Sequence, residues 1–211
     1  MAEIILKDVC KSFSEKTIFE NFSLEVNEGE YLSVMGESGK GKTTLLNIIG
    51  MIDTPDSGKV TIQGHKNPNF SSRAAVNLRR YDISYLFQNC GLIDTETVEN
   101  NLKIALHFKK VSKGKKKNLI ADTLSHVGLK GYERRKIFTL SGGEQQRVAL
   151  AKIIVKSPQI ILADEPTGNL DQKNRDYVLE ILNSLNSEGK TVIIVTHDPY
   201  VASCAGKHIQ L

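Results

Sequence analysis

The chain lacks the features that would place it in a membrane or outside the cell. None of its apolar runs approaches the roughly 20 residues that an α-helix needs to cross a bilayer, and residues 1–7 lack the layout of a signal peptide. Cysteine is scarce. Cys10, Cys90 and Cys204 are odd in number and far apart, which fits free thiols in a reducing compartment better than disulfides or a zinc site. We therefore expect a cytosolic chain, and any membrane-embedded part belongs to another polypeptide.

Positive charge is concentrated in one short stretch of the chain. The formal net charge is +4, and six lysines between residues 109 and 117 account for more than this excess. Nucleic-acid-binding surfaces spread their basic residues over a docking face, often with aromatic residues, whereas here only Phe108 lies close by. We therefore expect no nucleic acid partner. We interpret the stretch as a solvated loop between two helices, and contact with anionic lipid head groups is the alternative.

A glycine-rich segment between residues 36 and 43 matches a phosphate-binding loop. Its sequence, GESGKGKT, fits the pattern G-x-x-x-x-G-K-[ST]. The apolar residues 31–35 before it predict a buried strand, and residues 44–49 after it predict a helix that begins at about Lys42 or Thr43. The loop N–H groups and the positive end of the helix dipole bind phosphate, while the lysine and the threonine reach the terminal phosphates and Mg²⁺. We expect nucleotide contacts from Gly36, Ser38, Gly39, Lys40, Gly41, Lys42, Thr43 and Thr44.

Two further aliphatic segments, residues 159–163 and 191–195, predict strands of the same sheet. Their dense apolar composition is typical of parallel strands that helices cover on both faces. Each ends in residues able to do chemistry, the first in an acidic pair and the second in Thr196 and His197. Open α/β sheets bind ligands beyond the carboxyl ends of their strands. The sequence therefore predicts an active site at this edge.

The acidic pair is Asp164 and Glu165. A carboxylate at the end of the strand can bind Mg²⁺ directly or through a water molecule, which assigns Asp164 to the metal site. The next residue, Glu165, is placed to orient or deprotonate the water that attacks the γ-phosphoryl group. Such pairs elsewhere are more often helix caps or surface charges, but the phosphate loop upstream favours the catalytic interpretation.

A second candidate anion site occurs in the sequence LSGGEQ at residues 140–145. Ser141 can cap a helix whose N–H groups remain open, and Gly142 and Gly143 allow close approach of a ligand. We expect Gln145 to belong to the same site. One nucleotide does not need two such cradles from one chain, so we predict that this helix end faces the γ-phosphate bound by another copy, in a twofold-symmetric dimer with two sandwiched ATP molecules.

The remaining patterns outline the predicted organisation of the fold. Short strands at residues 4–9, 21–26 and 60–63 predict a small antiparallel sheet. Apolar residues at spacings of three and four predict helices at residues 98–111, 118–127, 143–155 and 172–185. We predict one α/β domain over residues 1–211, with a phosphate-loop NTPase core and β subdomain at residues 1–86 and 157–211 and an inserted α-helical subdomain at residues 87–156.

Together these segments resemble the nucleotide-binding subunits of ABC transporters over essentially the whole chain. The matching features are the phosphate loop, residues 140–144, the acidic pair, Asn169 to Asp171, Gln88 and His197. The resemblance implies an ATPase with ATP and Mg²⁺ as cofactors. It also implies residue roles: Phe13 stacks on adenine, Gln88 senses Mg²⁺ and the attacking water, Asp171 contacts the opposite subunit and His197 holds the γ-phosphate. It finally implies a homodimer or a paired ATPase subunit and a separate transmembrane permease, at the cytoplasmic face of the membrane.

Two segments indicate a branch within this family. Residues 143–147 and 165–171 resemble the branch that serves lipoprotein release, macrolide or peptide export and cell division, and residues 93–97 resemble exporters of lactococcin-972-type bacteriocins. We expect export of a peptide, bacteriocin-like or amphipathic substrate. The alternative is a regulatory ATPase that drives a membrane partner in cell-wall division without transport. Lys40, Lys152 and Asp94 stand where the branch usually has serine, arginine and proline, and we expect Lys40 to point into solvent because phosphate contacts in such loops are mainly made by the backbone.

Overall fold

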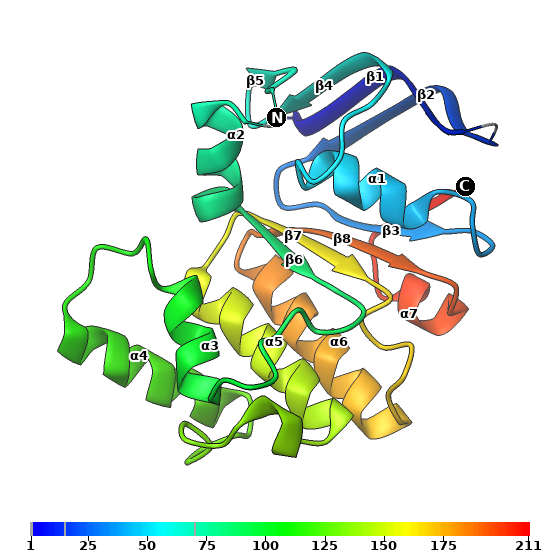
Figure 1. The fold of residues 1–211 in the computed structure, drawn as a ribbon. Coiled ribbons are helices and arrows are strands. Elements are labelled where there is room, and N and C mark those ends of the chain that lie inside the picture. Colours follow the sequence, from blue (N-terminus) through cyan, green and yellow to red (C-terminus); the bar gives the residue numbers. More distant parts are fainter. Residues whose placement is uncertain (1, 15, 70) are drawn as a thin grey trace.

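A parallel sheet forms the centre of the computed structural model, which describes residues 2–14, 16–69 and 71–211 (Figure 1). Five strands lie in the order β6 (Ile83–Leu86), β7 (Ile160–Asp164), β8 (Thr191–Thr196), β3 (Tyr31–Met35) and β9 (Lys207–Gln210). All residues of β7 and β8 are buried. The pairing of β7, β8 and β3 is in register, so the carboxyl ends of these strands meet at one edge.

A second, antiparallel sheet confirms the predicted small sheet beside the core. Its order is β2 (Lys16–Asn27), β1 (Ala2–Phe13), β4 (Ser57–Ile62) and β5 (His65–Lys66). β1 and β2 are 12 residues each, longer than the predicted strands. Their pairing contains several register shifts, which interrupt the regular alternation that a sequence pattern can detect.

Helix α1 (Lys42–Ile49) lies between the two sheets (Figure 1). Its buried residues Leu45, Leu46, Ile48 and Ile49 pack in one cluster with side chains from both sheets. The cluster includes Ile4 of β1, Val34 of β3 and Leu162 of β7. This packing fixes the start of α1, and with it the glycine loop, at the edge of the parallel sheet.

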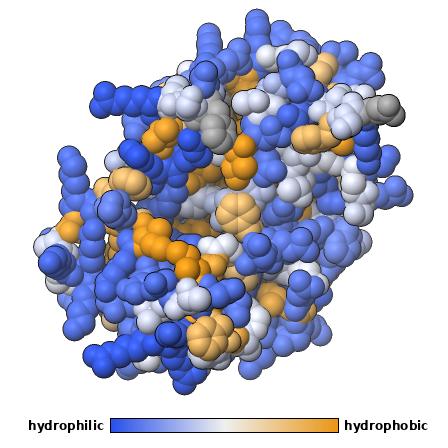
Figure 2. All heavy atoms as spheres, in the orientation of Figure 1, coloured by the Kyte–Doolittle hydropathy of each residue, from blue (hydrophilic) through white to orange (hydrophobic). Residues whose placement is uncertain are grey.

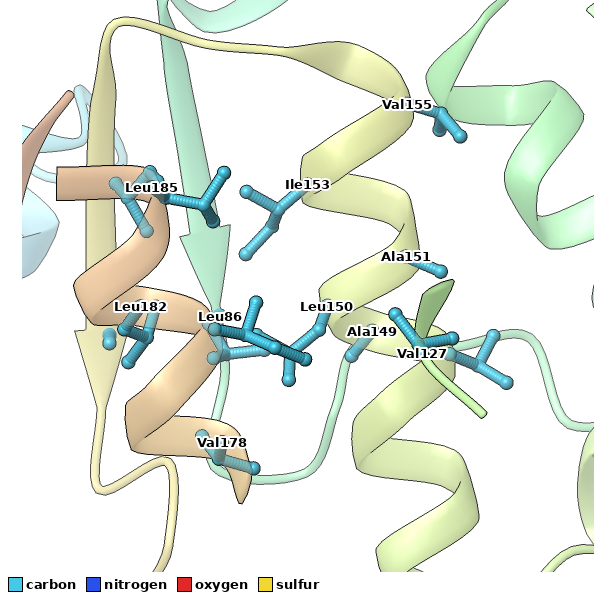
Figure 3. Packing of buried hydrophobic residues seen from close by; sticks show 14 of the residues in the cluster. Leu86, Val127, Ala149, Leu150, Ala151, Ile153, Val155, Val178, Leu182 and Leu185 are labelled. Carbon is cyan, nitrogen blue, oxygen red and sulfur yellow. The ribbon is translucent and has the colours of Figure 1, made fainter. Parts of the chain in front are cut away.

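Two long helices, α5 (Gly142–Lys156) and α6 (Gln172–Ser187), cover the other face of the parallel sheet (Figure 1). Leu86 of β6, Leu150 and Ile153 of α5 and Leu182 of α6 point toward one another in this second core (Figure 3). The remaining elements are α2 (Arg73–Asn77), a π-helical turn (Leu78–Asp82), α3 (Val98–Ala105), α4 (Lys113–His126), a 3₁₀ turn (Ile137–Thr139) and α7 (Pro199–Ser203).

The structure corrects two helix boundaries and the interpretation of the lysine-rich stretch. Helix α3 ends at Ala105 rather than at residue 111, and α4 begins at Lys113 rather than at residue 118. Four of the six lysines therefore lie on a helix, whose first turn is capped by the Ser112 side chain. The stretch is also not wholly solvated, because Lys109 Nζ donates to the Val155 carbonyl and Lys116 Nζ to the Leu106 carbonyl, both at 2.8 Å. The prediction of a solvated loop is wrong here.

The predicted division at residues 86/87 and 156/157 stays a prediction. The segment between them contains α3, α4 and α5, but α5 shares one buried cluster with β6, β7 and α6. In the described part of the chain, none of the helices is long and apolar enough to cross a membrane. The three cysteines are free thiols, as predicted.

Candidate active site

A pocket of about 890 Å³ opens at the carboxyl edge of the parallel sheet. It brings together the glycine loop, the acidic pair and residues from four further segments of the chain. Its lining consists of Phe13, Lys16, Ile18, Glu37, Ser38, Gly39, Gly41, Lys42, Thr43, Thr44, Gln88, Asp164, Glu165 and His197. The three strand ends therefore meet as the sequence predicts.

The glycine loop presents the beginning of α1 to this pocket. Gly41 precedes the helix with φ at 94°, and no side chain caps the first turn, so its N–H groups are available to an anion. A Cβ atom on Gly41 would lie 2.4 Å from Cγ2 of Ile18, so glycine is required for packing as well as for conformation. The buried ammonium of Lys42 donates to the carbonyls of Gly36 (2.7 Å) and Glu37 (3.0 Å).

Asp164 lies at the base of the pocket, and both of its carboxylate oxygens accept hydrogen bonds. Thr43 Oγ1 donates to Oδ1 of Asp164, and the Tyr85 hydroxyl donates to Oδ2. Both donor–acceptor distances are 3.3 Å. Burial raises the pKa of the Asp164 carboxyl, and the two hydrogen bonds oppose this effect. The Thr43 hydroxyl and the Asp164 carboxylate are hard oxygen donors of the kind that Mg²⁺ prefers, and phosphate oxygens would complete such a site.

Glu165 occupies a strained backbone position directly after β7. Its φ is 44°, a left-handed conformation that non-glycine residues adopt at a cost and that often marks functional sites. Glu165 Oε2 accepts a hydrogen bond from Thr196 Oγ1 (3.3 Å), and Oε1 lies 2.9 Å from His197 Nδ1. The His197 side chain is 71% exposed and that of Glu165 is 14% exposed, so the carboxylate lies behind an exposed imidazole at the rim of the pocket.

The helix end at residues 141–145 lies apart from this pocket. The Ser141 side chain accepts from the Glu144 N–H and the Glu144 side chain accepts from the Ser141 N–H, which forms a complete capping box. Hydrogen bonds from the Ser141 backbone and the Tyr132 hydroxyl lower the pKa of the Glu144 carboxyl. A Cβ atom on Gly143 would lie 2.7 Å from the Asn174 amide, which Asp171 and Arg147 hold in place.

The structure thus gathers some predicted site residues and separates others. Gly142 and Gln145 line a different cavity, of about 380 Å³, which Gln88 and Glu165 also reach. Ser141, Gly143 and Asp171 line neither of these two cavities. Gly36 and Lys40 do not line the main pocket either; Gly36 is buried and Lys40 is exposed, as we expected for its side chain. Phe13 keeps 49% of its surface exposed beside the pocket.

The sequence motifs do not predict a site role for four residues near the pocket. Lys16 Nζ donates to the Gly39 carbonyl at 3.1 Å, and Ile18 and Glu37 also line the pocket. Tyr85 touches Asp164 from β6. Lys16, Ile18 and Tyr85 lie outside the motifs, and only the pairing of strands brings them to the site. Glu37 occupies a position that the phosphate-loop pattern leaves free.

The fold and the pocket define a phosphate-loop nucleotide-binding protein. Comparison with known proteins narrows this class. The family described as "ABC transporter" matches residues 19–168. The ABC transporter ATP-binding protein YvrO of Bacillus subtilis (strain 168) is 38% identical, and the match covers 98% of this chain and 92% of YvrO. The chain therefore belongs to the ABC transporter family and is an ATPase.

Two further comparisons bear on assembly. The macrolide export ATP-binding/permease protein MacB of Campylobacter jejuni subsp. jejuni serotype O:2 (strain ATCC 700819 / NCTC 11168) is 37% identical over 99% of this chain, which spans only 32% of MacB. A dimeric structure of the ATP-binding cassette MJ0796 in a post-hydrolysis state, bound to ADP and Pi, superposes with a TM-score of 0.89 at 38% identity and covers 99% of this chain and 94% of that one.

Proposed function

We propose that this chain binds and hydrolyses ATP in order to drive a separate membrane-spanning partner. The observation that carries the proposal is that the nucleotide pocket and a second, apolar and basic groove meet at one segment. Gln88 lines the pocket, while its neighbours Phe87 and Cys90 line the groove. A change at the nucleotide can therefore reach a bound partner through the short turn at residues 87–90.

The chemistry assigned to the pocket is hydrolysis of the γ-phosphoryl bond. The glycine-loop N–H groups and Lys42 hold the phosphates, and Phe13 offers its exposed ring to adenine. Thr43, Asp164 and Gln88 would hold Mg²⁺, and the bound ion would neutralise charge on the β- and γ-phosphates. Glu165 takes the proton of the attacking water, and His197 contacts the γ-phosphate. The hydrogen bonds to Thr196 and His197 direct the Glu165 carboxylate.

A second copy completes the site in this proposal. Ser141, Gly142, Gly143 and Gln145 form a helix end that does not line the main pocket of their own chain, and Asp171 caps the adjacent helix α6. In a head-to-tail dimer these residues face the γ-phosphate and the opposite subunit. The MJ0796 cassette, 38% identical to this chain, has a dimeric structure, which supports the proposal of a dimer.

The groove supplies a docking surface for the membrane partner. It has a volume of about 490 Å³ and lies between the π-helical turn, β6, α3 and α5. Apolar side chains gather on this face over α3 (Figure 2), and Phe87, Ile104 and Phe108 are exposed there. Its basic residues include Arg80, Lys152 and Lys156, and no aspartate or glutamate is among the described residues that line it. We expect the docking segment of the partner to combine apolar anchors with a carboxylate.

Export is the direction of transport that we propose. MacB, the similar protein that joins an ATP-binding part to a permease, is named for macrolide export, and the resemblance of residues 93–97 points to a peptide or bacteriocin-like cargo. The complex then works at the cytoplasmic face of the membrane.

The test is to capture tagged Glu165→Gln protein with ATP from detergent-solubilised membranes of its own host, with Lys42→Ala as the matched control that loses nucleotide binding. We expect a multi-span protein to be retained with the first variant and not with the second. Its extracellular architecture separates export from regulation of cell-wall division. Recovery of soluble partners alone, ribosomes in particular, contradicts the membrane assignment and leaves the ATPase.

A further inference from the structure

Tyr85 stands between the nucleotide pocket and the groove. Its ring lines the groove, while its hydroxyl lies 3.3 Å from Oδ2 of Asp164. The reason is the strand register: Tyr85 on β6 pairs with Leu162 on β7, two residues before the carboxylate. The length of the phenol side chain spans that distance, so the hydroxyl reaches the end of the neighbouring strand.

Two contacts fix the direction of the Tyr85 hydroxyl. The ring stacks on that of Phe87, with centroids 4.1 Å apart and an interplanar angle of 16°. The hydroxyl also lies 3.3 Å from Oδ1 of Asn47 on α1. A phenol has one proton to donate, and a hydrogen bond to an ionised acceptor is stronger than one to a neutral amide. The proton therefore goes to Asp164.

The two oxygens of Asp164 are consequently held from two different elements. Thr43, at the start of α1, donates to Oδ1, and Tyr85, on β6, donates to Oδ2. A carboxylate with both oxygens held keeps one rotamer, and hydrogen bonds of this kind orient metal-ligating carboxylates. If Thr43 and Asp164 held a cation together, the Tyr85 contact would still orient Asp164.

We propose that Tyr85 is a positioning residue that orients Asp164 toward the divalent cation of the bound nucleotide. The proposal rests on the function proposed above, because it takes Asp164 as a metal ligand. It assigns to Tyr85 a role that depends on its hydroxyl, whereas its ring serves packing and the wall of the groove.

The test compares wild type with Tyr85→Phe, which keeps the ring and removes the hydroxyl. Isothermal titration of the full chain with a non-hydrolysable ATP analogue, once with Mg²⁺ and once with EDTA, gives the gain in affinity that Mg²⁺ provides. We expect this gain to fall about ten-fold in Tyr85→Phe, with affinity in EDTA unchanged. In hydrolysis assays, the Mg²⁺ concentration for half-maximal rate rises while the rate at saturating Mg²⁺ changes little.

Two further variants make the outcome decisive. Asn47→Ala removes the other neighbour of the hydroxyl and leaves the Mg²⁺ gain unchanged if the proposal is right. An equal Mg²⁺ gain in wild type and Tyr85→Phe, or equal losses in Tyr85→Phe and Asn47→Ala, overturns the role of Tyr85. Asp164→Asn separates a failure of the proposed metal site from a failure of the role of Tyr85. If Asp164→Asn keeps the full Mg²⁺ gain, the metal site of the proposed function is wrong. If Asp164→Asn loses the Mg²⁺ gain and Tyr85→Phe keeps it, only the role of Tyr85 is refuted.

Discussion

Glu165 is the residue on which the proposed chemistry depends most. It lies in a left-handed backbone conformation, and its carboxylate is held by Thr196 and His197. Glu165→Gln keeps the shape and removes the basic oxygen. We expect ATP hydrolysis to fall about a hundred-fold or more, because a general base contributes that much, while ATP binding persists. Steady-state phosphate release together with nucleotide titration measures both. An equally active Glu165→Gln enzyme rules out this assignment of the base.

Lys156 does not line the nucleotide pocket, and it makes a pH-dependent contribution to stability. Its ammonium donates to the carbonyls of Arg79 and Ile83, and burial lowers its pKa from 10.5 to about 8. Between these two pKa values the unfolded chain holds a proton that the folded chain has lost. The free energy of unfolding therefore rises with pH in this window.

We expect the wild type to gain about 1 to 2 kcal/mol relative to Lys156→Met between pH 7.5 and pH 9.5. Below pH 8 the folded protein carries the full cost of the buried charge. Urea unfolding of both proteins at the two pH values measures the difference. A stability difference that stays constant, or that moves against the wild type, contradicts the predicted ionisation of Lys156.

At the scale of elements, two helices with the same kind of cap allow a matched comparison. The side chain of Ser141 caps α5 and that of Ser112 caps α4. Replacing either by alanine costs about 1 kcal/mol of stability. We expect Ser141→Ala to reduce ATP hydrolysis as well, since in the proposed dimer its helix end faces the nucleotide of the other copy, and Ser112→Ala to leave hydrolysis unchanged. Equal hydrolysis in both variants, at equal loss of melting temperature, argues against a functional role for this helix end.

The elements also show which parts of the fold the sequence pattern reveals. The buried strands β3, β7 and β8 and the motifs at their ends were predictable, because dense aliphatic runs and chemically reactive residues coincide there. Strand β6 has only four residues, and β9 has no buried residue, so neither forms a dense aliphatic run like those of β7 and β8. The start of α4 was missed because its first turn is rich in lysine and glycine, although Ser112 supplies the cap.

The contacts between elements explain what the sequence could not reveal about the site. Lys16 and Tyr85 carry no motif, and they reach the pocket through the pairing of β1 with β2 and of β6 with β7. The end of α3 was misplaced for a related reason. Apolar residues continue at helical spacing through Phe108 and Val111, but both are exposed, so burial does not extend the helix beyond Ala105.

At the scale of the whole molecule, we propose that two copies complete one another's ATP sites. The variant Glu165→Gln isolates this proposal because we expect it to bind ATP without hydrolysing it. Gly142→Asp is the variant that should prevent dimerisation without disturbing the single chain. A Cβ atom on Gly142 meets open space, and a carboxylate in the first turn stabilises the helix. In a dimer the same carboxylate would face the phosphates of the other copy and repel them.

The most direct measurement is sedimentation velocity of Glu165→Gln with Mg²⁺ and ATP, beside the double variant Glu165→Gln with Gly142→Asp. We expect the single variant to sediment as a dimer of the 23.4 kDa chain only when ATP is present, and the double variant to bind ATP but remain a monomer. A Glu165→Gln protein that is saturated with ATP and still sediments as a monomer, or a double variant that dimerises equally well, contradicts the proposal.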